Sequence, residues 1–212
     1  MKKSITPRQS ELLLIIYNYI KNEGYPPTFD EMRGKLQVVS NQSIIDLLNK
    51  LEKGRFIKRT ENIARSIAIL PLGYEVLGKP PLAPFLGGTT AGTPVEPIEI
   101  NGEWQELPGE VSRFSNQVFL LKVHGDSMIN AGIDDGDVVL VKNEKEFVSG
   151  NIVLARIGDG FTVKRFISDE KPPYIYLKPE NPKYKIIPAT DEIQLKGKVL
   201  SVFKKGAWMG LK

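Results

Sequence analysis

The sequence has no cysteine, one histidine and no long apolar run. Without cysteine, disulfides and thiolate metal sites are excluded, and a lone His124 does not make a zinc site of the usual kind. The early apolar stretch 12–16 is too short for a signal core, and no run approaches the ~18 apolar residues of a membrane helix. The sequence therefore predicts a cytoplasmic protein with no membrane segment, no metal and no cofactor.

The positive charge of the chain is concentrated near its beginning. The chain has 212 residues, of which 41% are hydrophobic and 25% charged, which suits two small globular domains. The first 70 residues hold 12 Lys and Arg against 7 Asp and Glu, whereas the remainder holds 17 against 18. This distribution is typical of a phosphate-binding module joined to a second domain. A solvated basic face would give the same count, so the partner stays open at this point.

Three helices are predicted in the basic part. The segment 6–9, Thr-Pro-Arg-Gln, combines a capping box with proline at the first helical position, and an apolar face continues to Gly24. The segment 28–31, Thr-Phe-Asp-Glu, opens a second, short helix in the same way. A third helix is predicted to begin at the polar segment 40–43 and to end at Gly54.

Two short β-type runs, 56–59 and 66–69, follow these helices and predict a hairpin. Three helices and a hairpin form a winged helix-turn-helix, whose third helix enters the major groove of DNA. A structural or protein-binding winged helix is the alternative. We expect phosphate contacts from basic residues that include Arg59 and Arg65, and Ile45 either touches a thymine methyl or belongs to the core. The residues expected to face DNA are Ser40, Asn41, Gln42, Ser43, Asp46, Asn49 and Lys50.

The rest of the chain is predicted to be a linker and a β domain, which makes the fold class α+β. The segment 71–84 is rich in proline and glycine and is expected to be a non-helical linker between a domain at 1–70 and one at 85–212. Six β-type runs indicate that the second domain is mostly antiparallel, and they lie at 118–123, 137–141, 152–156, 161–166, 174–177 and 195–203.

Two places in this domain could carry chemistry. Ser127 follows Gly125 and Asp126 directly after a strand, in a turn that can expose its hydroxyl. Lys164 lies in mid-strand, and period-two alternation puts it on the same face as Thr162. A Ser-Lys pair can replace Ser-His-Asp when the lysine is kept neutral by burial. A glycine turn and a strand lysine are more often only structural, so these residues alone leave catalysis undecided.

A family resemblance bears on both domains. The segments 6–9, 24–28 and 51–54 resemble the DNA-binding domain of LexA repressors, and the segments 123–128, 132–137, 150–156 and 162–165 resemble the LexA and UmuD autoproteases in order and spacing. The resemblance implies Ser127 as nucleophile and Lys164 as general base. It also implies oxyanion donors in the backbone amides of Asp126 and Ser127, with Thr162 orienting Lys164.

The same resemblance implies self-cleavage between Ala91 and Gly92, in the segment that joins the domains. It implies a homodimer formed through the second domain, with 196–203 at the interface, bound to double-stranded operator DNA. Cleavage would be stimulated by the RecA filament and would relieve repression of the DNA-damage (SOS) response. The alternatives are a prophage repressor of the same architecture and a DNA-binding regulator that no longer cuts. A signal peptidase would share the Ser-Lys chemistry but would carry a membrane anchor and no DNA reader.

Overall fold

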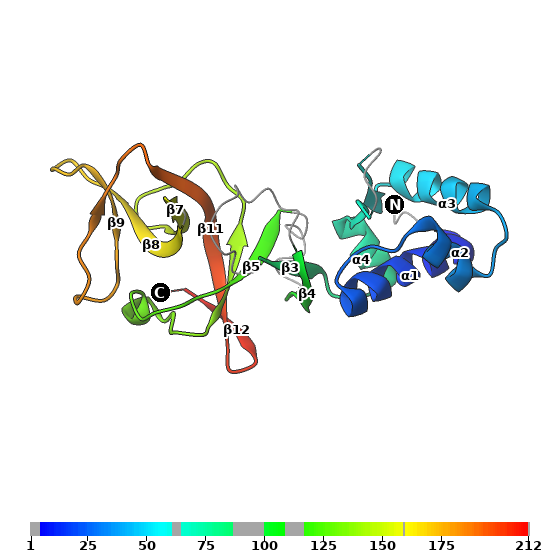
Figure 1. Cartoon of the computed structure of the whole chain (residues 1–212), viewed down its shortest axis with the longest axis horizontal. Helices are drawn as coiled ribbons and strands as arrows, with labels where there is room; N and C mark the ends of the chain where they lie inside the picture. The colour runs from blue at the N-terminus through cyan, green and yellow to red at the C-terminus, as the bar shows by residue number, and fades with distance from the viewer. Residues whose placement is uncertain (1–4, 61–64, 87–99, 109–116, 159, 212) are drawn as a thin grey trace. The chain divides into compact units, whose positions relative to one another are not determined.

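The protein is described by a computed structural model that covers residues 5–60, 65–86, 100–108, 117–158 and 160–211. The chain divides into two compact units, Met1–Phe85 with Ile100–Asn116, and Leu86–Glu99 with Gln117–Lys212. Figure 1 shows helices in the first unit and mainly strands in the second. The α+β class predicted from the sequence is confirmed, and the predicted domain boundaries at 70 and 84 stay a prediction.

Three helices of the first unit begin where their capping residues predict, and α1 and α3 end at the predicted glycines. α1 (Pro7–Glu23) starts after Thr6 with a complete capping box and ends at Gly24, whose φ is 82°. α2 (Phe29–Leu36) starts after Thr28 with a second complete capping box, and α3 (Asn41–Lys53) starts after Ser40. The caps satisfy backbone N–H groups that have no partner inside the helix, so these boundaries are set locally by the sequence.

The helices enclose one apolar core and carry the predicted hairpin. β1 (Ile57–Lys58) pairs antiparallel with β2 (Ala68–Ile69), which confirms the hairpin although its strands are shorter than predicted. The fully or nearly fully buried side chains come from every helix and from the hairpin, and include Leu12, Ile16, Met32, Ile44, Leu48, Ile57, Ile69 and Tyr74. The described part of this unit is therefore a winged helix-turn-helix built on a shared core.

The expectation that 71–84 is non-helical was wrong. α4 (Pro71–Leu77) lies inside this segment, with Pro71 at its start and the left-handed Gly78, φ 62°, at its end. Proline at the first position and glycine after the last are helix signals as well as linker residues. β3 (Leu82–Leu86) and β4 (Ile100–Glu106) follow, and both were missed because neither shows a regular alternation. Trp104 of β4 packs against the core and donates from Nε1 to the Gly24 carbonyl at 2.8 Å.

The second unit is an antiparallel β structure. Its strands lie in the order β10-β9-β8-β7-β11-β6-β5, and β12 pairs with the C-terminal part of β11. Their bounds are β5 Val118–Lys122, β6 Val138–Lys142, β7 Ile152–Ile157, β8 Gly160–Ser168, β9 Ile175–Lys178, β10 Ile187–Pro188, β11 Ile193–Lys204 and β12 Ala207–Gly210. All six predicted runs are strands. The two additional described strands, β10 and β12, were not predicted, and β10 has only two residues.

β8 and the turn after β5 are held by the same apolar core. Val163 of β8 is buried together with Val139 and Val141 of β6 and Met128, which directly follows Ser127. Met128 is 1% exposed, so it fixes the chain just after the serine. A short 3-10 helix, η2 (Ile129–Ala131), continues from there. The fold thus anchors both ends of the predicted Ser-Lys pair on rigid elements.

Candidate active site and DNA-binding surface

The structure brings Ser127 and Lys164 together. The Lys164 Nζ lies 2.8 Å from the Ser127 Oγ, 2.6 Å from the Thr162 Oγ1 and 2.9 Å from the Val163 carbonyl oxygen. Thr162 and Lys164 are two residues apart on β8, so their side chains share one face as the sequence predicts. Three oxygen atoms therefore surround one amine.

Lys164 is buried among apolar neighbours. Only 7% of the residue is exposed, and the strand register places Val153 of β7 directly opposite it. Ala155 and Leu177, which are also buried, belong to the same small apolar cluster as Val153. Burial lowers the pKa of the Lys164 amine from its usual 10.5, because the charged form loses its hydration. No ion pair joins Lys164 to a carboxylate within the part of the chain that the structure describes.

A neutral amine can satisfy the three contacts of the Lys164 Nζ. A neutral amine has two N–H groups and one lone pair. It can donate to the Thr162 hydroxyl and the Val163 carbonyl, and its lone pair can accept from the Ser127 hydroxyl. The arrangement can therefore remove a proton from a serine, which is the requirement for a serine nucleophile.

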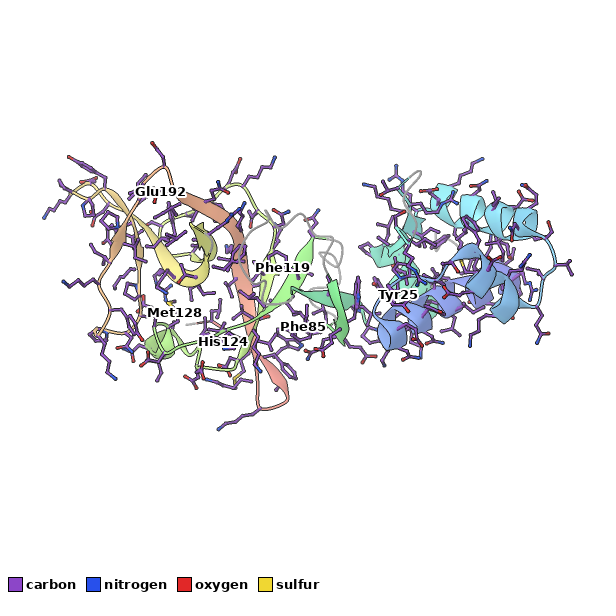
Figure 2. All side chains as sticks on the ribbon, in the orientation of Figure 1. Tyr25, Phe85, Phe119, His124, Met128 and Glu192 are labelled. Carbon is purple, nitrogen blue, oxygen red and sulfur yellow. The ribbon has the colours of Figure 1, made fainter. Side chains whose placement is uncertain are left out.

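A glycine shapes the turn that presents Ser127. Gly125 has a φ of 89°, a backbone conformation that residues with a side chain rarely adopt. Its N–H donates to the Asp135 Oδ1 at 2.7 Å. His124, the sequence neighbour of Gly125, is exposed, and no hydrogen bond joins it to Ser127 among the described residues. His124 and the buried Met128, which flank this turn in the sequence, are labelled in Figure 2. A Ser-His arrangement is therefore not formed here.

Asp126 is held by side chains that sequence reasoning missed. Asn181 donates to its carbonyl oxygen at 3.0 Å and to its carboxylate at 3.1 Å, and Tyr184 donates to the same carboxylate. The Tyr184 hydrogen bond, followed by the smaller effects of the Asp126 backbone N–H and Lys183, lowers the pKa of Asp126. No sequence pattern pointed to Asn181, because 55 residues separate it from Asp126.

The two backbone N–H groups expected to stabilise an oxyanion differ in the interactions of their surroundings. The N–H of Asp126 already interacts with its own carboxylate, which is one cause of the low pKa of that group. The N–H of Ser127 belongs to the peptide whose carbonyl is bound by Asn181. The predicted cleavage site, Ala91 and Gly92, lies outside the described residues.

The seven residues predicted to face DNA are exposed on α3 or at its cap. Ser40 is the N-cap, and its Oγ accepts from the Gln42 N–H at 3.1 Å. The Gln42 side chain donates to Asp46 at 2.9 Å. Ile45 is half-buried and does not belong to the core cluster of the described residues, so the core interpretation is not supported. The exposed face consists of Ser40, Asn41, Gln42, Ser43, Asp46, Asn49 and Lys50.

Two arginines expected to contact phosphates also form contacts within the domain. Arg59 forms a two-pronged ion pair with Glu52, at 2.9 and 2.7 Å, and also donates to Asn49 at 2.6 Å. Arg65 lies 4.0 Å over the ring of Tyr25 and 3.3 Å from Glu31. These contacts tie the hairpin to α3 and α2, so the role of both side chains in the free protein is structural.

Sequence comparisons match both units. The model of the LexA DNA binding domain family matches residues 2–66, and the model of the Peptidase S24-like family matches residues 84–200. Within the described residues, no helix is long and apolar enough to cross a bilayer, and no group of three or more metal-binding side chains is gathered.

Full-length relatives agree with the two family matches. The LexA repressor of Pediococcus pentosaceus is 33% identical over 208 residues, covering 96% of this chain and 98% of the relative. The LexA repressor of Enterococcus faecalis is 35% identical over 96% of this chain and 97% of its own length. That of Caldicellulosiruptor saccharolyticus is 35% identical over 97% and 100%. The chain therefore belongs to the LexA repressor family and combines a LexA DNA-binding domain with an S24 serine peptidase domain.

Proposed function

We propose that the chain represses SOS genes by binding operator DNA and ends repression by cutting itself between Ala91 and Gly92, with Ser127 as nucleophile and Lys164 as base. The observation that carries the proteolytic part is the 2.8 Å distance between the Ser127 Oγ and the Nζ of the buried Lys164. LexA repressors of similar length and the S24 family match support the repressor and protease roles.

The proposed reaction proceeds in two halves. The Lys164 amine takes the Ser127 proton while the Oγ attacks the Ala91 carbonyl carbon, and the Ser127 N–H stabilises the oxyanion. The C–N bond to Gly92 then breaks, and the Lys164 ammonium returns its proton to the departing amine. A water molecule, deprotonated by Lys164, hydrolyses the acyl-enzyme and releases a fragment that ends at Ala91.

The proposed DNA complex uses the exposed face of α3 in the major groove. Amide and hydroxyl groups there can contact base edges, and Lys50 can contact a phosphate. Because operator DNA lies in the cytoplasm, this proposal places the protein there. Because each half-site contact is weak, cleavage that separates the DNA reader from a dimer would reduce avidity by about 10²- to 10⁴-fold.

The proposal includes a homodimer and stimulation by the RecA filament, as the family resemblance implies. The segment 196–203 lies within β11, whose backbone pairs with β6, β7 and β12, so edge-to-edge strand pairing through this segment is not available. Contact through side chains of β12 is the form that fits. Met209 of β12 is 48% exposed. The rings of Trp208 and Phe203, which lie opposite each other in the β11–β12 pair, have centroids 5.2 Å apart.

The test compares self-cleavage in the parent, Ser127→Ala and Lys164→Ala. Purified full-length chains are incubated at mildly alkaline pH, and mass spectrometry identifies the fragments. We expect cleavage between Ala91 and Gly92 in the parent only. Cleavage of either variant at the rate of the parent, or a cut elsewhere, would contradict the proposal.

A further inference from the structure

A buried asparagine lies against the turn that presents Ser127. Asn181 is 6% exposed, and its Nδ2 donates to the Asp126 carbonyl oxygen at 3.0 Å and to the Asp126 carboxylate at 3.1 Å. Its own Oδ1 accepts from the Lys183 N–H at 3.1 Å. A buried amide with both ends hydrogen-bonded has a fixed orientation, because rotating it would leave polar atoms without partners.

The Asp126 carbonyl and the Ser127 N–H belong to one peptide unit. This unit is planar and trans, so its C=O and N–H groups point in opposite directions. A side chain that fixes the direction of the Asp126 carbonyl therefore also fixes the direction of the Ser127 N–H. That N–H is the oxyanion donor in the proposed reaction. It stabilises the transition state best when it already points at the oxyanion position before the negative charge develops.

The chain around Asn181 is also tied to β8. Glu180 accepts through its carbonyl from the Asn130 N–H at 3.1 Å, and through its carboxylate from the Arg165 Nε at 2.6 Å. Asn130 lies three residues after Ser127, and Arg165 is the neighbour of Lys164. The segment Glu180–Tyr184 thus contacts both sides of the Ser-Lys pair, and Tyr184 adds a hydrogen bond to the Asp126 carboxylate.

We infer that Asn181 is a positioning residue for self-cleavage: its hydrogen bond to the Asp126 carbonyl aims the Ser127 N–H at the oxyanion of the acyl-transfer step. The inference rests on the proposed function of Ser127 and Lys164. Tyr184 supports the same turn through the carboxylate of Asp126 and does not touch the carbonyl, so its contribution is the smaller one.

The test uses Asn181→Leu in the full-length chain. Leucine keeps the branched shape and neutrality of asparagine but removes the donor and the acceptor. Self-cleavage rates are measured as a function of pH. The curve gives a plateau rate and a half-maximal pH, which is the pH at which the rate is half of the plateau. We expect the plateau to fall about 10- to 100-fold, because a small misalignment of a reacting group has effects of this size. The half-maximal pH stays unchanged, because Lys164 keeps its surroundings.

The half-maximal pH separates positioning from a merely structural role. Loosening of the core around Lys164 would admit water and raise the pKa of the amine, and the half-maximal pH would move upward with it. An upward shift that accounts for the slower cleavage therefore overturns the inference. Asn151→Leu is the matched control, since the Asn151 Oδ1 accepts from the Val148 N–H at 3.1 Å and, among the described residues, no hydrogen bond joins the Asn151 side chain to Asp126 or Ser127. We expect this control to cleave within about 3-fold of the parent.

A second measurement reads the hydrogen bond itself. The carbonyl ¹³C shift of Asp126 and the amide ¹⁵N shift of Ser127 are recorded by NMR in a Lys164→Ala background, which keeps Ser127 and holds the chain intact. We expect both signals to move in Asn181→Leu and to move little in Tyr184→Phe. Unmoved signals, or a plateau within about 2-fold of the parent, would overturn the inference.

The outcomes also distinguish this inference from the proposed function. If Ser127→Ala or Lys164→Ala cleaves like the parent, the proposed function fails. If both are inactive and Asn181→Leu cleaves like the parent at every pH, only the role of Asn181 fails. Asn181→Ser replaces the leucine variant if the latter does not fold, because the shorter hydroxyl cannot span the distance to the Asp126 carbonyl, and the same two outcomes apply to it.

Discussion

The Lys164 amine lies 2.8 Å from the Ser127 hydroxyl although 37 residues separate them in the sequence. β8 supplies the lysine, and the buried Met128 fixes the chain that follows the serine. The amine is buried, and within the described residues no ion pair with a carboxylate stabilises its charge. This combination supports the proposal that Lys164 acts as a proton acceptor.

Self-cleavage should accelerate with rising pH. Only the unprotonated amine can take the Ser127 proton, and burial lowers the Lys164 pKa below its usual 10.5. The rate should rise about tenfold per pH unit below the pKa of Lys164 and level off above it, because the neutral fraction grows in that way. Initial rates of the full-length chain between about pH 6 and 10 measure this. A flat profile would count against Lys164 as the base.

The buried lysine should also lower stability at neutral pH. The folded pKa is depressed, so between that value and 10.5 the unfolded chain binds one more proton than the folded chain. Stability contributed by this group therefore rises with pH in this window, by at most about 1.4 kcal/mol per unit, and is lost as pH falls. Lys164→Met removes the dependence, so we expect greater stability near neutral pH and a flatter profile.

Urea unfolding of Ser127→Ala, with and without Lys164→Met, measures this effect without cleavage. The two free-energy curves should converge as pH approaches 10.5, the usual value for lysine. Parallel curves, with the same pH slope in both chains, would show that Lys164 does not change its protonation on folding.

Local signals allowed most of the fold to be predicted. The capping boxes at Thr6 and Thr28 fix where α1 and α2 begin, because the bonds that cap a helix join residues three apart. α4 was missed since Pro71, Gly73 and Gly78 were interpreted as linker residues. In the structure they are a helix start, a close contact and a helix end.

The site was predictable only in part. Alternation along β8 placed Thr162 and Lys164 on one face, but nothing local gives the distance from that face to Ser127. Family resemblance supplied the pairing. Asn181 had no such signal, because its importance depends on a contact with the Asp126 carbonyl from 55 residues away.

A substitution at Gly73 should test how closely α4 packs, and one at Gly34 of α2 provides a contrast. A Cβ added at Gly73 would lie 2.4 Å from the Phe56 carbonyl oxygen, which is backbone and cannot move aside easily. Gly73→Ala should therefore destabilise the chain by about 1–3 kcal/mol. Gly34 on α2 meets nothing within 4 Å, so Gly34→Ala should stabilise by about 0.5–1 kcal/mol. Urea unfolding in the Ser127→Ala background measures both. A neutral Gly73→Ala would mean that α4 does not pack closely on the hairpin.

Lys50 and Arg59 should differ in their effect on operator binding. Lys50 is exposed on α3, whereas Arg59 is engaged by Glu52 and Asn49. A lysine that neutralises one phosphate releases counterions, so Lys50→Gln should weaken binding at all operator sequences and reduce the slope of log affinity against log salt by about 0.9. Arg59→Gln removes a partly buried ion pair, so it should lower the unfolding midpoint and leave the salt slope unchanged.

Fluorescence anisotropy with a labelled operator, at several salt concentrations, gives both slopes. The Ser127→Ala background keeps the two domains joined during the measurement. A reduced slope for Arg59→Gln would mean that Arg59 leaves Glu52 to contact DNA, because only a cation at a phosphate displaces counterions. An unchanged slope for Lys50→Gln would instead place α3 differently on the operator, since a cation on its exposed face would then reach no phosphate.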